Sequence, residues 1–499
     1  MLTPTHTAII TGLAIYAIVM LGISIFFMFR VSKPADYLMA GRGRPAWILV
    51  GVVMGMCIGT GVFIGATGLA YQHGWAGSAY PFGLGLGTLL AGLAFAGMRR
   101  HQFMTLSEEI ACYYCDNRAV VEFSNIALFF SQLCWLTVQL MGGAALLGAV
   151  TGMPRASCMA LAGLITAAFA VPGGLKAIVY INSLQTLILL TGFCLLVYSA
   201  LSHSGGLAGL TQGVPPERLS FLGAQSYGAW KVFGLIFTLG LAVVADPGRR
   251  LAMFTARSTA GARTAMVVAG LVVMCFSFSI GVAGMYAFKL NARLPAADQS
   301  LPWLIMNVLP PWLAAVVVVS IVSGVFSAAN SNATAAGTFY VRHIYPLAAG
   351  RLPKNPMLTA RCALAGAFLI ATIAGLFTSD IVGFVVKFLA VVMSGMAVII
   401  LAGRFWPRAT WQGALAALIT APAVSLTVMF LPGILSIPIP AQGAGALWAT
   451  PAIPAFIAGL AAHVVTSLLT PPRARTFEEV ATQMREAREA IEAPNSLRS

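Results

Sequence analysis

The stretch that decides the fold is residues 311–345, which read PWLAAVVVVSIVSGVFSAANSNATAAGTFYVRHIY. It begins as continuous hydrocarbon and becomes a ladder of small and hydroxyl side chains inside a span long enough to cross a bilayer. Polar side chains at such depth are tolerated only against protein or a wet cavity, so we predict a helix that faces inward. Close packing of small residues is the alternative explanation. We predict ligand contact at Ser327, which follows Gly324 by three positions. The residues concerned are Ser320, Ser323, Gly324, Ser327, Asn330, Ser331, Asn332, Thr334 and Thr338.

The composition around this stretch indicates a polytopic, all-α membrane protein. Of 499 residues, 59% are hydrophobic and only 9% are charged, which does not describe one soluble domain. The first apolar span lacks a basic n-region and a small-residue cleavage site, so we predict an anchor rather than a signal peptide. A window of about 19 residues gives thirteen predicted spans, at 7–29, 46–71, 77–98, 119–151, 157–174, 177–201, 228–246, 264–288, 311–341, 358–377, 382–402, 411–432 and 447–470.

The net charge of +15 comes from basic residues that gather on one side of the predicted membrane. Alternate predicted loops, beginning with 30–45 and ending with the C-terminal tail, hold 23 of the 29 Lys and Arg residues. By the positive-inside rule these loops are cytoplasmic, which places the N-terminus outside. We therefore expect a plasma membrane, such as a bacterial inner membrane, and the lipid bilayer rather than nucleic acid as the partner of these charges.

Glycines crowd the second predicted span, where each costs an unbroken helix roughly 1 kcal/mol relative to alanine. We predict a break near Ile58–Gly61, because broken membrane helices present free carbonyls at mid-depth to ions and polar solutes. A close-packing glycine face is the alternative. We predict a second interruption at Leu239–Gly240, because two interrupted spans five apart are typical of an inverted repeat with its site between the repeats. The glycines of the second span are Gly55, Gly59, Gly61, Gly65 and Gly68.

Other spans carry polar faces. Gln132, Trp135 and Gln139 share one face of the fourth span. Asn182 and Gln185 form a polar face in the sixth span. Each face either lines a pathway or joins helices by hydrogen bonds.

Charge is scarce inside the predicted spans. No Asp or Glu lies deep in any of them, so the sequence predicts no carboxylate proton relay. The one deep charge is Lys387. Its cationic head either snorkels outward toward Asp380 or binds an acidic group of a solute.

The eight cysteines and six histidines form no recognisable catalytic set. The cysteines are scattered and mostly lie in apolar spans, so we predict packing residues rather than a disulfide framework. Cys112 and Cys115 form one C-x-x-C, but no second pair follows and no zinc site is predicted. Without a Ser/His/Asp, zinc or phosphate-loop constellation, we expect neither an enzyme nor a cofactor.

Two polar segments carry capping boxes. Thr105 and Glu108 predict a short surface helix before the fourth span, and Thr476 and Glu479 predict a helix in the tail. We expect this tail helix to pack against the cytoplasmic face through a weak apolar stripe. The stripe consists of Phe477, Val480, Met484 and Ile491.

Several segments taken together resemble the sodium:solute symporter family. They occur in the family's order between residues 36 and about 415, and their joint spacing carries the resemblance. The resemblance implies thirteen helices in a leucine-transporter-like core of five plus five inverted repeats, at about 46–201 and 228–402, within a transporter domain 1–470 followed by a tail 471–499. The segments are DYLMAGRGRPAW, FIGATGLAY, PGGLKAIVYINSLQ, ADPGRRLAMFTARS, LPWLIMNVLPPWLAAVVVVSIVSGVFSAANS and RFWPRATWQGALA.

The resemblance also implies a sodium site between the first break and the ninth span. Its ligands would be backbone carbonyls of Gly55, Ile58 and Gly324 and the hydroxyl of Ser327. The chain departs from the family at Ala328, where a second Ser or Thr is usual, and at Asn182, where an Asp is usual. Losing hard oxygen ligands weakens a sodium site without abolishing it. The candidates for the solute pathway are Cys57, Gly59, Thr60, Gly61, Gln132, Trp135, Gln139, Asn182, Gly240 and Lys387.

We therefore predict a secondary active transporter that imports a small polar organic solute, such as an amino acid or a carboxylate, by alternating access. Na⁺ is the predicted coupling ion, and no other metal is expected. The alternatives are proton coupling, uncoupled exchange, and a sensor that acts with a separate signalling partner. The sequence names neither the solute nor the oligomeric state.

Overall fold

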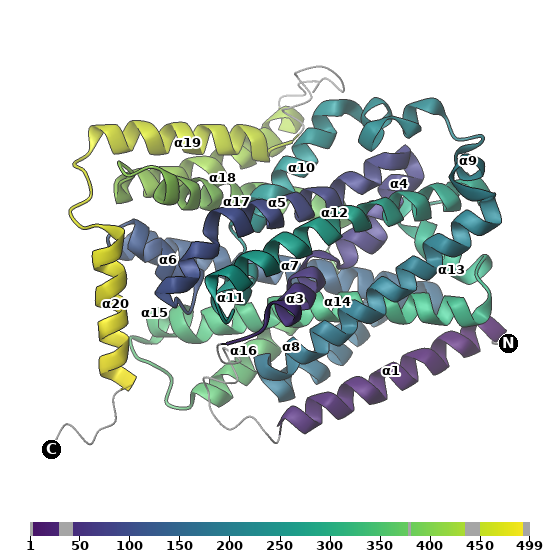
Figure 1. Ribbon diagram of the computed structural model, residues 1–499, viewed down its shortest axis with the longest axis horizontal. Coiled ribbons are helices and arrows are strands. Elements are labelled where there is room, and N and C mark those ends of the chain that lie inside the picture. Colours follow the sequence, from purple (N-terminus) through teal and green to yellow (C-terminus); the bar gives the residue numbers. More distant parts are fainter. Residues whose placement is uncertain (1–2, 29–42, 378–380, 435–449, 493–499) are drawn as a thin grey trace.

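The computed structural model describes residues 3–28, 43–377, 381–434 and 450–492. Apart from an isolated bridge between Arg44 and Ala256, the regular elements of these residues are helices. Most of the long helices lie along the long axis of the molecule, and the two termini lie at opposite ends of it (Figure 1). The long helices are α1 (Pro4–Met28), α5 (Ala79–Phe95), α7 (Arg118–Thr151), α8 (Arg155–Ser204), α10 (Ala229–Val244), α12 (Thr259–Leu290), α14 (Pro311–Phe339), α16 (Pro356–Gly375), α17 (Ile381–Phe405), α18 (Trp411–Ile434) and α19 (Ala452–Leu469).

Shorter helices mark the two ends of the bundle (Figure 1). The end toward the C-terminus, which we call the α6 end, carries α6 (Leu106–Tyr113), α11 (Pro247–Phe254) and α20 (Phe477–Glu492). The opposite end, which we call the α13 end, carries α9 (Gly206–Thr211) and α13 (Ser300–Asn307). The remaining short elements are η2 (Gly74–Ser78), η3 (Ala96–His101), η4 (Pro216–Leu219), η5 (Phe221–Gly223), η6 (Ala224–Gly228), η7 (Ala297–Gln299), η8 (Tyr340–Ile344) and α15 (Tyr345–Ala349).

Eleven helical segments of the described residues are long and apolar enough to cross a membrane, which agrees with a multi-pass membrane protein. The predicted span 46–71 is divided into α3 (Ala46–Cys57), η1 (Gly61–Ala66) and α4 (Thr67–His73). α3 alone is too short to be one of the eleven, whereas η1 and α4 belong with α5 to the segment Gly61–His101. The predicted spans 157–174 and 177–201, together with the loop expected between them, all fall within α8. The count of thirteen spans stays a prediction.

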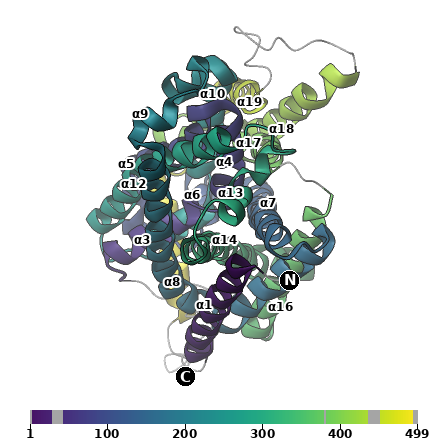
Figure 2. The same cartoon turned by 90° about the vertical axis from the view of Figure 1, so that its right-hand side faces the viewer.

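α14 lies at the centre of the bundle. It packs against α1, α3, α7, α8 and α16, and the end-on view shows it surrounded by neighbouring helices (Figure 2). Eight of the nine small and polar residues singled out in this helix are buried, and Asn332 is half-buried. The prediction that this span faces inward is therefore confirmed.

The predicted second interruption at Leu239–Gly240 is wrong. α10 continues as a helix to Val244, and the chain turns only at Ala245 before α11 begins. Gly240 stays in the helix beside Gly87 of α5, because a Cβ on Gly87 would lie 2.8 Å from the Cα of Gly240. It is Gly87 that lets α5 approach α10, since a Cβ on Gly240 itself would meet no atom within 4 Å.

α6 and α20 pack together at the α6 end. α6 is a buried helix rather than the predicted surface helix, because α20 covers it: Phe477 lies 5.2 Å from Tyr113 between ring centroids, and the Cys112 and Met484 sulfurs are 3.8 Å apart. The capping box of α20 is confirmed, with Thr476 and Glu479 bonding each other's backbone N–H groups. The side chain of Ile491, the last residue of the predicted stripe, is not among those that the structure describes.

The C-x-x-C at this end shows no metal-binding arrangement. Among the described residues no group of three or more His, Cys, Asp or Glu side chains could hold a metal ion. Burial raises the pKa of the Cys112 thiol, which disfavours the thiolate that metals and redox partners require. The cysteines of the predicted spans divide between buried positions (Cys57, Cys134 and Cys158) and exposed ones (Cys194 and Cys275).

Gly270→Ala tests the close crossing of α12 and α5. The added Cβ would lie 2.7 Å from the Gly85 carbonyl oxygen and from the Leu89 nitrogen, and backbone atoms cannot move aside singly. We expect the free energy of unfolding to fall by about 1–3 kcal/mol, which lowers the melting temperature of the purified protein. Gly366→Ala is the control, because a Cβ there meets no atom within 4 Å. Equal melting temperatures for the two variants would contradict the packing account.

Candidate functional site

The first core helix breaks where the sequence predicts it. α3 ends at Cys57, and Ile58 leaves helical geometry with φ −101° and ψ 83°. The chain resumes as the π-helix η1, whose first N–H groups, from Val62 and Phe63, donate to the Gly59 carbonyl. The break is thus confined to Ile58 and Gly59, within the predicted range.

α14 lies directly against this break. A Cβ on Gly324 would lie 3.0 Å from the Ile58 carbonyl oxygen, and a Cβ on Gly55 would overlap the Ser327 hydroxyl. Only glycine permits these approaches. The structure therefore brings together all four residues of the predicted ion site. Thr186 of α8, which the sequence analysis missed, lies beside Gly55 and donates to the Gly51 carbonyl at 2.8 Å.

The side-chain oxygens along this face of α14 are buried and short of partners. Ser327 is fully buried, and its hydroxyl has no hydrogen-bond partner among the described residues. Asn330 Oδ1 and Thr334 Oγ1 are also buried and have no hydrogen-bond partner among the described residues. Buried polar atoms are rarely left without a hydrogen-bond partner. This face of α14 is therefore suited to bind an ion that is coordinated by oxygen atoms.

Asn182 of α8 contacts α14 at Ser331, one helical turn after Ser327. Its Nδ2 donates to Ser331 Oγ at 2.7 Å, and Ser331 Oγ donates to the Ser327 carbonyl at 2.9 Å. Asn182 Oδ1 has no partner among the described residues. The Asn182 amide thus joins α8 to α14 beside the break. At this residue of the sixth span, the polar face joins helices by hydrogen bonds, which was one of its two predicted roles.

The polar face of α7 meets the other side of the break. Gln139 Oε1 accepts from the Thr60 N–H at 2.8 Å, and the Thr60 hydroxyl donates to the Gln139 carbonyl at 3.1 Å. Gln139 therefore supports the start of η1. Gln132 and Trp135 are buried, and Gln132 Oε1 and Trp135 Nε1 have no partner among the described residues, so a role in the pathway stays a prediction for them.

The remaining pathway candidates divide into those at the break and those away from it. Gly61 faces the Tyr80 hydroxyl, and Cys57 Sγ lies 3.4 Å from Thr88 Oγ1. Gly240 faces α5 instead. Lys387 is exposed and lines a cavity of about 490 Å³ with Gly65 and Asp298. Asp380, its predicted partner, lies outside the described residues.

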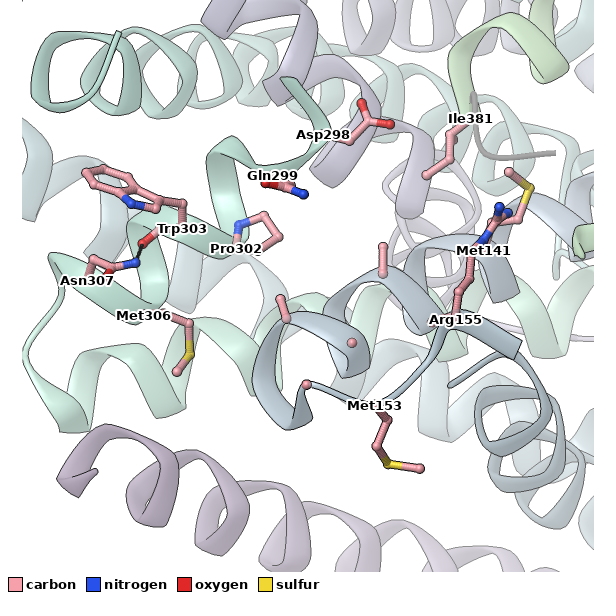
Figure 3. A pocket seen from close by; sticks show the side chains of 15 residues that line it. Met141, Met153, Arg155, Asp298, Gln299, Pro302, Trp303, Met306, Asn307 and Ile381 are labelled. Carbon is pink, nitrogen blue, oxygen red and sulfur yellow. Dashed lines mark hydrogen bonds between the residues drawn. The ribbon is translucent and has the colours of Figure 1, made fainter. Parts of the chain in front are cut away.

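A second cavity, of about 550 Å³, opens on the other side of Asp298 at the α13 end (Figure 3). Figure 3 shows the Asp298 and Gln299 side chains on one wall and Arg155 on the facing wall, where Arg155 donates to the Gly375 carbonyl at 2.8 Å. Ile381, which also lines this cavity, is next to Val382, which lies against Gly65 of η1. Both cavities therefore lead from the α13 end toward the helix that follows the break.

Two buried ion pairs lie at the α6 end. Arg249 pairs with Asp246 at 2.6 Å, and Arg250 pairs with Glu109 at 3.1 Å. All four side chains are less than a tenth exposed. The sequence analysis predicted no carboxylate deep in a span and missed these pairs. The consecutive arginines of ADPGRR were the available signal.

The comparisons with known proteins identify the chain. A model of the sodium:solute symporter family matches residues 37–421. The chain belongs to the sodium:solute symporter family. Sodium/pantothenate symporters of Haemophilus influenzae and Escherichia coli are each 23% identical to it, over 70% and 82% of this chain and 75% and 88% of their own length. A sodium/glucose cotransporter of Vibrio parahaemolyticus is 24% identical over 84% of both chains.

Solved structures confirm the leucine-transporter-like fold. A Na⁺-coupled sialic acid symporter in a substrate-bound, outward-open state superimposes with a TM-score of 0.77 at 16% identity, over 94% of this chain and 98% of its own. A nucleobase-cation-symport-1 family transporter gives a TM-score of 0.52 at 12% identity, over 90% and 99%. As a member of the sodium:solute symporter family, the protein is a multi-pass membrane transporter and not an enzyme.

Gly55→Ala tests the contact between α3 and α14. The added methyl would occupy the space beside the Ser327 hydroxyl and displace it from the break. If an ion binds there, sodium chloride should raise the melting temperature of the unmodified protein above its value in choline chloride of equal concentration. We expect Gly55→Ala to abolish this sodium-specific rise.

Gly22→Ala in α1 is the matched control, because a Cβ there meets no atom within 4 Å. Its sodium-specific rise should equal that of the unmodified protein. A full sodium effect in Gly55→Ala would remove Gly55 and Ser327 from the ion site.

Proposed function

We propose that this symporter uses Na⁺ to drive the uptake of a small polar organic solute by alternating access. The observation that carries the proposal is the fully buried Ser327 hydroxyl, which has no hydrogen-bond partner among the described residues and lies beside Gly55 near the α3 break. A monovalent cation without directional bonding is well matched to such a set of hard oxygens. The names of the relatives, which are sodium symporters, support the same ion.

The donor set at the break fits sodium in chemistry. Gly55 and Ile58 supply carbonyls freed by the break, and α14 supplies Ser327 together with the carbonyl of Gly324. Ala328, which is buried, removes one hydroxyl that the family usually has. Thr186, beside Gly55, is an additional oxygen from α8. We therefore expect a sodium site of modest affinity.

Proton coupling finds less support in the described residues. It requires a carboxylate or another titratable group that changes charge during the cycle. The buried carboxylates Glu109 and Asp246 each face an arginine, at the α6 end rather than beside the unpartnered oxygens of α14. Neither is placed to exchange a proton with the solute site.

The α13 end offers the route by which a solute would enter. Two cavities open there on either side of Asp298, and one of them contains Lys387. Water-facing charges of both signs favour a polar solute over an apolar one. The excess of basic residues in the loops of the α6 end favours the cytoplasm on that side, which makes the α13 end the outer one. A bacterial inner membrane is the expected location.

Uptake by purified protein in liposomes tests the function. An inward sodium gradient should drive accumulation of at least one solute from a panel that includes pantothenate, glucose, sialic acid and amino acids. A choline gradient, or a sodium ionophore, should abolish the accumulation. If no solute is accumulated or stabilises the protein, and a signalling protein copurifies with it, the sensor alternative replaces transport.

Ser327→Ala tests the ion ligand directly. Loss of one charge-assisted contact, about 1.5–3 kcal/mol, should raise the half-saturating sodium concentration by roughly ten- to a hundredfold. Ala328→Ser should lower it by restoring a hydroxyl. Ser320→Ala is the control on the same helix, because Ser320 donates to the Ile188 and Val316 carbonyls away from the break. Equal sodium dependence in all three variants would favour the packing explanation of α14.

A further inference from the structure

α11 carries two consecutive arginines between α3 and α6. The Asp246 carboxylate caps its first turn by accepting from the Arg249 N–H at 3.0 Å. Consecutive side chains on a helix diverge by about 100°. Arg249 and Arg250 therefore extend from the same short, rigid helix to different neighbours.

Arg249 extends to the broken end of α3. Its guanidinium is held by the Asp246 carboxylate and donates to the Met56 carbonyl at 3.3 Å and to Cys57 Sγ at 3.6 Å. Met56 and Cys57 are the last residues of α3. A helix C-terminus leaves carbonyls unpaired and carries partial negative charge, which a guanidinium compensates. Arg249 thereby fixes the position of the carbonyl end that adjoins the proposed sodium site.

Arg250 extends to α6 and to two other helices. Its guanidinium donates to both Glu109 carboxylate oxygens at 3.1 and 3.2 Å and to the Val244 carbonyl of α10 at 3.2 Å. It also lies 3.6 Å over the Phe95 ring of α5. Glu109 accepts a further hydrogen bond from the Tyr113 hydroxyl at 2.8 Å. One cation thus joins α5, α6 and α10 where the α6 end is closed.

An ion pair is suited to a contact that must open and close. A buried pair adds little stability beyond what a well-packed apolar pair would give, because desolvation offsets the attraction. When water enters, the two charges regain hydration, so separating them is easier than exposing an equal apolar surface. Cavities are open at the α13 end in this structure, so alternating access requires the contacts of the α6 end to separate in another state.

We propose that α11 couples the ion site to the closure of the α6 end. With an ion at the α3 break, Arg249 holds α11 against the end of α3 and Arg250 holds α6 through Glu109. Departure of the ion shifts the carbonyl end of α3, moves α11 with it, and separates Arg250 from Glu109. This inference rests on the proposed sodium-coupled function.

Hydrogen exchange on the full-length protein in nanodiscs tests the coupling. Amide exchange is compared in sodium and in choline chloride, with α14 reporting ion binding and α6 reporting closure. In the unmodified protein sodium should slow exchange in both helices several-fold. In Arg249→Met sodium should still slow exchange in α14 but no longer in α6. Arg249→Lys should restore part of the α6 effect, because it keeps a cation at Met56.

The exposed pair Arg118–Glu122, whose two side chains lie on one helix at the same end, supplies the matched control. Arg118→Met should leave the sodium effect on α6 unchanged. If Arg249→Met does not fold, the double variant Glu109→Met with Arg250→Met carries the test. An apolar pair should keep α6 closed without sodium, so that α6 exchange is slow in both salts while sodium-driven uptake falls at least tenfold.

The outcomes separate this inference from the proposed function. A sodium effect on α6 that persists unchanged in Arg249→Met, or normal uptake and sodium-dependent α6 exchange in the double variant, would overturn the coupling and leave sodium transport intact. No sodium effect on α14 in the unmodified protein would overturn the sodium site, and the coupling with it.

Discussion

The close approach of α14 to the broken end of α3 is the contact on which the rest of this symporter depends. Gly324 faces the Ile58 carbonyl and Gly55 faces Ser327. Larger residues at either glycine would separate the helices and leave the carbonyls of the break in hydrocarbon, which membranes do not tolerate. The neighbours complete the arrangement, with Gln139 supporting the resumed helix from α7 and Asn182 joining α8 to α14.

The charges of the protein are divided between two different tasks. Most basic residues fall in the loops that the sequence predicts on one side of the membrane, where such charges favour one orientation of a chain. Arg249 and Arg250 are nearly fully buried and are neutralised by Asp246 and Glu109. Burying a guanidinium without its carboxylate is strongly unfavourable. In this structure the Arg250–Glu109 pair therefore holds α11 to α6, while the Arg249–Asp246 pair lies within the α11 segment.

The sequence predicted the break in α3 and the buried face of α14 better than it predicted the ends of the molecule. The break in α3 could be predicted because repeated glycines destabilise a helix whatever packs around it, and the orientation of α14 followed from its buried hydroxyls. The same reasoning failed at Gly240, because a single glycine lowers the stability of a helix without having to break it. The capping box at Thr105 and Glu108 predicted a surface helix, because the local sequence does not show that α20 covers this segment.

Some site residues could not be found from spacing at all. Thr186 and Tyr80 come to the break from α8 and α5, and their types are common in membrane helices without function. The pairing of Arg250 with Glu109 joins residues 141 positions apart, and local patterns carry no record of such a partner. The positions where sequence reasoning succeeded are those at which the backbone itself is unusual.

The Arg249 contact with the end of α3 also constrains how this protein is made. Met56 and Arg249 are 193 residues apart, so at about 5–20 residues per second the ribosome needs roughly 10–40 seconds to supply the partner. The isolated bridge between Arg44 and Ala256 ties the start of α3 to the same late segment. During that interval α3 exists without the guanidinium that contacts its end. Its terminal carbonyls need another hydrogen-bond donor, such as water, until Arg249 has been made.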